Sequence, residues 1–195
     1  PFTMVTQILD RVADGARFVY AYYDGLDKVG HVHGIGRHYL DELEFIDVLV
    51  ARITEGLPEG ATLLVTADHG MVDVGPSLVE VNDGALACTA STSGEARFMW
   101  LHAKQGAAPD LLDAAGAHRD VGWVVPLERV LDERWFGPVV AHDARIRLGD
   151  VALVARDPIA FVEPGSPDSP WLVGRHGGLT AEEMHVPLLQ LAGQA

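Results

Sequence analysis

The sequence contains a single cysteine and far fewer basic than acidic residues. Cys88 alone excludes an internal disulfide framework and any zinc site built from four cysteines. Lys and Arg total 14 against 28 Asp and Glu, which gives a net charge of −14 with His neutral. Such a chain repels phosphate backbones and anionic membrane surfaces, which argues against a role in coating nucleic acid. An anionic substrate stays possible where a bound divalent metal reverses the local sign.

Long apolar runs are also missing, because no stretch approaches the roughly 20 residues of a membrane span. The chain opens Pro1-Phe2-Thr3 without the basic and apolar start of a secretory leader, so a cytoplasmic protein is the working expectation. What is present is typical of a globular chain: 195 residues, of which 48% are hydrophobic and 22% charged. Nine histidines are many for this length.

Hydrophobic periodicity predicts an α/β fold. Apolar positions at helical spacing predict helices over residues 2–12 and 37–57, and short β-rich runs predict buried strands over 17–23 and 61–67. The polar segment 24–36 is expected to be a loop. Strand, helix and strand in succession form a βαβ unit, which predicts a mostly parallel sheet with helices on both faces.

The middle of the chain has a different texture. Residues 95–103 and 122–125 are expected to be strands, 109–117 and 126–134 helices, and 185–191 a closing strand. We therefore expect one α/β domain over residues 1–195, with a small α+β subdomain inserted at about 95–135.

Three short segments combine histidine, glycine and acidic residues beside predicted strands or helices. They are residues 27–31 (DKVGH), 66–71 (TADHGM) and 174–180 (GRHGGLT). Imidazole and carboxylate are the ligands that zinc and related metals prefer, and glycine lets the backbone turn so that side chains converge. Loop histidines and helix-capping aspartates are the alternative reading for any one segment, but three in one chain favour a metal site.

Neighbouring residues carry groups of the same chemical type. His33 and Asp24 read better as surface or outer groups than as ligands, and Thr66 reads as a core or outer residue rather than as a nucleophile. Lys28 and Arg175 lie beside expected ligands, where they either contact a phosphate or remain solvated loop charges.

These segments resemble motifs of the alkaline phosphatase superfamily, in its nucleotide pyrophosphatase/phosphodiesterase (type I phosphodiesterase) branch. The matching patterns are D-x-x-G-H at 27–31, D-H-G-M at 68–71 and H-G-G-L-T-x-E-E-M at 176–184. Any one of them is weak evidence, but their order and spacing over most of the chain make the resemblance specific. It covers only the C-terminal portion of the family's catalytic domain.

The resemblance implies two zinc ions. Asp27, His31 and His176 would hold one, and Asp68 and His69 would hold the other. In the family the second ion also takes an earlier Asp and a Thr or Ser nucleophile, both N-terminal to the first motif. Only 26 residues precede Asp27. We therefore expect the nucleophile to be absent, so that this chain offers one complete zinc site and is inactive alone.

The implied activity is hydrolysis of phosphodiesters or nucleotide pyrophosphates, with a small phosphate ester or nucleotide as substrate. Another branch of the superfamily (phosphatase, phosphonate hydrolase or phosphomutase) is the enzymatic alternative, and a non-catalytic metal-binding module is the other. A sheet without its N-terminal strands would also bare an edge, so self-association through that edge is expected.

Overall fold

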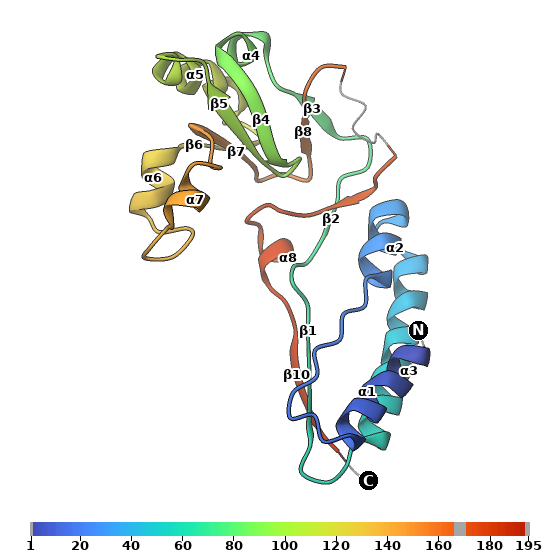
Figure 1. Ribbon diagram of the computed structural model, residues 1–195. Coiled ribbons are helices and arrows are strands. Elements are labelled where there is room, and N and C mark those ends of the chain that lie inside the picture. Colours follow the sequence, from blue (N-terminus) through green and yellow to red (C-terminus); the bar gives the residue numbers. More distant parts are fainter. Residues whose placement is uncertain (1, 166–170, 194–195) are drawn as a thin grey trace.

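The computed structural model describes residues 2–165 and 171–193. Figure 1 shows helices α1–α3 with strands β1 and β10 at one end of the molecule and a second lobe with most of the remaining strands at the other. Strands β2 (Val72–Asp73) and β9 (Gly174–Arg175) and helix α8 (Ala181–Met184) lie between the two. Among the described residues, no helix combines the length and apolar character needed to cross a bilayer.

The first end is organised by two helices. Helix α1 (Phe2–Ala13) packs on α3 (Arg37–Gly56) through a cluster that includes Val5, Leu49 and Ile53. Leu49 and Ile53 are four residues apart and therefore share one helix face. Each is at most 5% exposed, and burying such a side chain stabilises the fold by about 1.5–3 kcal/mol.

Strand β1 (Thr62–Thr66) follows α3 and pairs antiparallel with β10 (Leu188–Ala192), which places residues near the C-terminus beside the first third of the chain. The helices predicted at 2–12 and 37–57 and the strands predicted at 61–67 and 185–191 are all present with small shifts at their ends. Residues 17–23 are different, since the structure assigns them no strand. The expected βαβ unit at this point is therefore wrong in its first strand.

The second lobe is built on a four-stranded antiparallel sheet in the order β4-β5-β7-β6. Its strands are β4 (Thr89–Glu95), β5 (Phe98–Ala103), β6 (Gly122–Pro126) and β7 (Val151–Ala155). Every residue of β7 is buried, as expected of an inner strand. The helical elements of this lobe are α4 (Asp83–Cys88), α5 (Ala108–Ala115), η1 (Gly116–His118), α6 (Leu127–Asp132) and α7 (His142–Arg145).

Parallel pairing is limited in this structure. Among the described residues only β3 (Leu78–Glu80) and β8 (Ala160–Val162) pair in parallel, and the other ladders are antiparallel. The α/β class predicted from the sequence is confirmed, whereas the predominance of parallel strands is only partly visible. The expected strands and helices of the 95–135 region occur, and their sheet also includes β4 and β7 from outside that range.

Candidate metal centre

The first histidine motif lies on a helix rather than in the expected loop. Helix α2 (Gly25–His33) carries Asp27 and His31, which are four residues apart and therefore point from the same face. The distance between His31 Nε2 and Asp27 Oδ1 is 3.3 Å. The spacing of D-x-x-G-H is thus one helical turn, which brings a carboxylate and an imidazole together without any tight loop.

Two glycines allow close packing around α2: Gly30 leaves room for the side chain of Met71, and Gly174 lets β9 approach the backbone of α2. A Cβ atom added at Gly30 would lie 2.3 Å from the sulfur of Met71, and one added at Gly174 would lie 2.4 Å from the carbonyl oxygen of Gly30. Across the contact, the backbone N–H of Val173 donates to the carbonyl oxygen of His31 at 2.7 Å. Small residues on both sides therefore set the position of His31 against β9.

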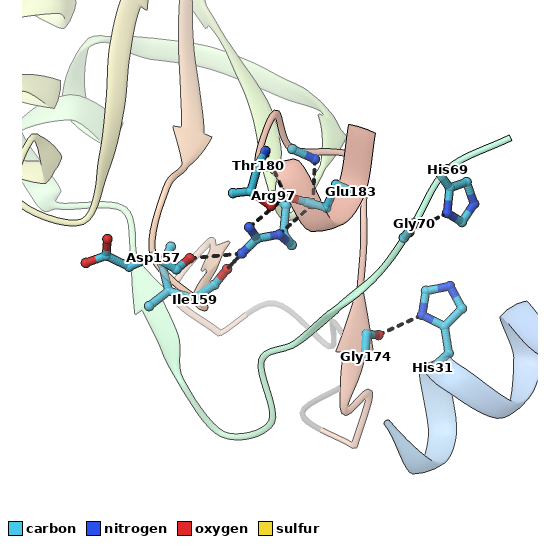
Figure 2. Close-up of polar contacts among 10 residues, drawn as sticks. His31, His69, Gly70, Arg97, Asp157, Ile159, Gly174, Thr180 and Glu183 are labelled. Atoms are coloured by element: carbon cyan, nitrogen blue, oxygen red, sulfur yellow. Dashed lines mark hydrogen bonds and ion pairs between the residues drawn. The ribbon is translucent and has the colours of Figure 1, made fainter. Parts of the chain in front are cut away.

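Hydrogen bonds fix the tautomers of two imidazoles. Nδ1 of His31 lies 2.8 Å from the carbonyl oxygen of Gly174, and Nδ1 of His69 lies 2.8 Å from that of Gly70 (Figure 2). A carbonyl oxygen only accepts, so each Nδ1 carries the proton and donates it. Each Nε2 is left with a lone pair, which is the form in which imidazole binds a metal.

Three imidazole nitrogens surround one carboxylate oxygen. His176 Nε2 lies 3.7 Å and His69 Nε2 3.9 Å from Oδ1 of Asp27, in addition to His31 at 3.3 Å. Oδ1 is buried and has no hydrogen-bond partner within the described part of the chain. Holding nitrogen lone pairs against a buried anionic oxygen costs free energy, unless a cation lies between the nitrogens and the oxygen. The donor set therefore fits a metal ion.

The position of His176 depends on the other histidines. Its ring stacks on that of His69, with centroids 3.5 Å apart, and its centroid is 5.1 Å from that of His31. Burial lowers the pKa of His176, and the neighbouring imidazoles of His69 and His31 lower it further, against the opposing charges of Asp27 and Glu95. A lowered pKa keeps the ring neutral near pH 7, as metal binding requires.

Asp68 lies at the outer side of the cluster. Its side chain is 61% exposed, and its Oδ1 is 3.8 Å from His69 Nε2. The hydroxyl of Tyr22 donates to Asp68 Oδ2 at 3.5 Å, and the charge of Asp68 is the main cause that raises the pKa of Tyr22. Tyr22 was missed as a site residue because its segment read as a buried strand. Its place five residues ahead of Asp27 is the only signal the sequence offers.

Several neighbouring polar residues lie outside the cluster. His33 is exposed, and its ring packs against His38 with centroids 4.3 Å apart. Lys28 forms an exposed ion pair with Asp24. The Thr66 hydroxyl donates to the carbonyl oxygen of Ala67 at 3.4 Å.

The five expected ligands lie in one place, and His69 also lies near the carboxylate that was expected to group with His31 and His176. Ligand atoms of Asp27, His69 and His176 all lie within 4.8 Å of one another. His31 was expected with Asp27 and His176, and it does approach Asp27. His69 comes within reach of the same carboxylate. Ligand atoms bound at about 2.0–2.2 Å around one zinc ion are about 3–4 Å apart, which matches the separations from Asp27.

Comparisons with known proteins identify the family of this chain. The family model described as type I phosphodiesterase / nucleotide pyrophosphatase matches residues 2–179. A search of curated proteins found no match. Among solved structures, murine ectonucleotide pyrophosphatase / phosphodiesterase 5 is similar with a TM-score of 0.72 and 21% identity, over 98% of this chain and 52% of that one. The human form gives 0.76 and 19%, over 96% and 50%.

A third similar structure is phosphonoacetate hydrolase from Sinorhizobium meliloti, with a TM-score of 0.64 and 21% identity over 84% of this chain and 43% of that one. At these identities the likeness shows that the chain shares the α/β fold of these structures. The chain spans about half the length of the solved structures it matches. Because the family model covers nearly all of the sequence, the chain belongs to the type I phosphodiesterase / nucleotide pyrophosphatase family.

Proposed function

We propose that this chain is the metal-binding portion of a zinc-dependent hydrolase that cleaves phosphodiesters or nucleotide pyrophosphates. One observation carries the proposal: the buried, unpartnered Oδ1 of Asp27 faces the Nε2 atoms of three histidines. Family membership supplies the reaction class, and the donor set of carboxylate and imidazole supplies the choice of zinc.

In this proposal Asp27, His31 and His176 hold one zinc ion, and Asp68 and His69 contribute to a second. Bound zinc supplies positive charge for the phosphate oxygens and lowers the pKa of an attacking oxygen. The chain's own residues orient these ligands. Gly174 and Gly70 accept the Nδ1 protons of His31 and His69.

Zinc titration of the chain tests this assignment. The first site keeps three protein ligands and the second only two, so we expect one tight and one weak binding event. His176→Ala should abolish the tight event. His69→Ala should leave it nearly unchanged because His69 serves the second ion, and loss of the tight event in this variant would contradict that assignment. Absence of zinc binding by the wild-type chain would contradict the proposal.

A nucleotide substrate is the second part of the proposal. An inactive form of murine ectonucleotide pyrophosphatase / phosphodiesterase 5 was solved in complex with AMP. By extension, the zinc-loaded form of this chain should bind a nucleotide phosphate. Because the chain carries a net charge of −14, it binds an anion only where positive charge is concentrated. The proposal places this positive charge at the metal centre.

The proposal assigns no nucleophile to the 195 residues. The hydroxyl of Thr66 donates a hydrogen bond to the carbonyl oxygen of Ala67, and the hydroxyl of Thr6 donates one to the carbonyl oxygen of Phe2 within α1. The metal-loaded chain should therefore not turn over a chromogenic phosphodiester. Turnover that His31→Ala abolishes would show that the nucleophile lies within this chain.

A phosphonate hydrolase is the second candidate, favoured by the likeness to phosphonoacetate hydrolase. Competition binding of AMP and phosphonoacetate to the zinc-loaded chain separates the two. Tighter binding of AMP supports the nucleotide enzyme, and tighter binding of phosphonoacetate supports the alternative. Zinc binding without affinity for either ligand would indicate a non-catalytic metal-binding module.

A further inference from the structure

A buried ion pair joins the second lobe to helix α8. Arg97, in the β4–β5 turn, is 0% exposed, and Glu183 on α8 is 2% exposed. Two bonds connect them: Nε to Oε1 at 2.6 Å and Nη2 to Oε2 at 2.8 Å (Figure 2). This is the two-pronged geometry in which arginine holds a carboxylate most strongly.

Arg97 is anchored on its own side of this contact. Its Nη1 donates to the carbonyl oxygens of Asp157 at 3.0 Å and Ile159 at 2.7 Å, in the segment between β7 and β8. The guanidinium thus bridges the β4–β5 turn and the β7–β8 connection. These backbone acceptors therefore hold the guanidinium in one place within the second lobe.

On the other side, Glu183 fastens the segment that carries His176. Its Oε1 accepts the backbone N–H of Gly178 at 2.8 Å, and its Oε2 accepts the hydroxyl of Thr180 at 2.8 Å. Burial alone would raise the pKa of Glu183, but the bonds from Arg97, Gly178 and Thr180 outweigh it, so that the pKa is lowered. The carboxylate is therefore ionised and has a donor on each oxygen.

The backbone of the same residue fastens the segment that carries His69. The carbonyl oxygen of Glu183 accepts the N–H of Gly70 at 2.7 Å. A Cβ atom at Gly70 would lie 1.9 Å from the carbonyl oxygen of Glu182, so only glycine permits this approach. Gly70 in turn accepts the Nδ1 proton of His69.

We infer that the Arg97–Glu183 pair is a positioning device that sets His69 and His176 relative to each other, and that the second lobe thereby controls the geometry of the metal centre. The inference rests on the proposed function because it concerns the zinc ligands. Arg97 and Glu183 act through other residues and are not ligands themselves. Outer hydrogen bonds of this kind orient ligands and tune metal affinity.

Glu183→Gln tests the inference, with Glu182→Gln as the matched control. Glu182 is the exposed neighbour on the same helix and undergoes the same chemical change. Zinc affinity is measured by chelator competition, and unfolding temperature and amide exchange at Gly178 are measured on the zinc-free chain. We expect Glu183→Gln to weaken zinc binding by about 10–100-fold and to speed Gly178 exchange, with Glu182→Gln unchanged.

A purely structural role predicts a different result. Glu183→Gln would then lower the unfolding temperature while the folded protein bound zinc with wild-type affinity, and this outcome would overturn the inference. Absence of zinc binding by the wild-type chain would instead contradict the proposed metal centre, which is the function on which the inference rests.

A second variant decides the matter if Glu183→Gln fails to fold. Thr180→Val removes one donor to Glu183 Oε2 and leaves the ion pair intact, whereas Thr180→Ser keeps the hydroxyl. The inference expects weaker zinc binding for Thr180→Val and wild-type binding for Thr180→Ser. Equal affinity for both would overturn it.

Discussion

Asp27 occupies the centre of the histidine cluster, and its environment explains why a carboxylate is needed there. The N–H protons of His31 and His69 are engaged by carbonyl oxygens on the far side of each ring. Oδ1 of Asp27 has no hydrogen-bond partner among the described residues. A cation is the partner that satisfies this oxygen and the nitrogen lone pairs together.

The first prediction concerns this charge. Asp27→Asn keeps the shape of the side chain but removes its negative charge, so zinc affinity should fall by more than the roughly 10–100-fold that losing an outer partner of a ligand costs. Chelator competition measures the change. Asp24→Asn is the control because Asp24 is exposed and pairs with Lys28. Equal zinc affinity of both variants would contradict the central role of Asp27.

Residue-level geometry around these ligands could be predicted only in part. The five expected ligands came from the resemblance of three motifs to one family, because any one of these histidine segments is weak evidence by itself. No local pattern pairs Tyr22 with Asp68, or Arg97 with Glu183, which is 86 residues away. Such partners depend on tertiary packing between distant segments, which a local sequence pattern does not describe.

A second prediction follows from a histidine far from the cluster. Nε2 of His118 accepts the backbone N–H of Asn82 at 3.2 Å and its side-chain amide at 3.0 Å, and burial lowers the pKa of His118. As pH falls below the ordinary value of about 6.5, the unfolded chain takes up this proton first, so the free energy of unfolding decreases.

Thermal unfolding between about pH 7.5 and pH 5.5 measures this effect. His118→Gln should lose less stability over that range than the wild type, because the group that binds the proton is gone. Some pH dependence should remain, since the pKa of His176 is lowered as well. An unchanged pH dependence in His118→Gln would refute the prediction that protonation of His118 lowers the stability of the fold.

At the scale of elements, the strongest periodic patterns were the most predictable. Helix α3 has a long apolar repeat and was located within one residue of its ends. Helix α2 was missed because nine residues with two glycines give a weak helical pattern. Strand β4 (TASTSGE) was missed because it has no alternating apolar residues and forms by pairing with β5.

The segment 17–23 shows the opposite error. Its aromatic and β-branched residues favour a strand, but β propensity describes how side chains fit beside a neighbouring strand. The structure assigns this segment no ladder, and Phe18 and Tyr20 are 83% and 76% exposed. Composition alone could not reveal the missing partner.

The third prediction concerns the contact between the D-H-G-M segment and α8. Gly70→Ala places a Cβ atom against the backbone of Glu182, where neither side can move easily. We expect unfolding free energy to fall by about 1–3 kcal/mol, as in other overpacked sites, together with weaker zinc binding. Gly36→Ala is the control, because a Cβ atom there meets nothing within 4 Å and φ is −127°. Equal stability of the two variants would contradict the contact.

At the scale of the whole molecule, the two ends differ in how well they cover their apolar residues. The sheet of the second lobe encloses a core with Leu101, Leu153 and Phe161 at most 1% exposed. The other end leaves large side chains uncovered on its strands, with Leu64 at 60% and Leu188 at 73% exposure. Within the described residues β1 pairs only with β10, so both strands keep an open edge.

The last prediction is that the chain self-associates through this end. Open strand edges with apolar side chains favour pairing with another copy, and a lysine on an edge strand discourages it. Sedimentation velocity of the wild type should therefore depend on concentration, and Leu188→Lys should shift the protein toward the monomer. Val139→Lys, a matched change at an 82% exposed site in the second lobe, should leave the association intact. A wild-type monomer at every concentration would show that the strand edges of β1 and β10 do not pair between copies.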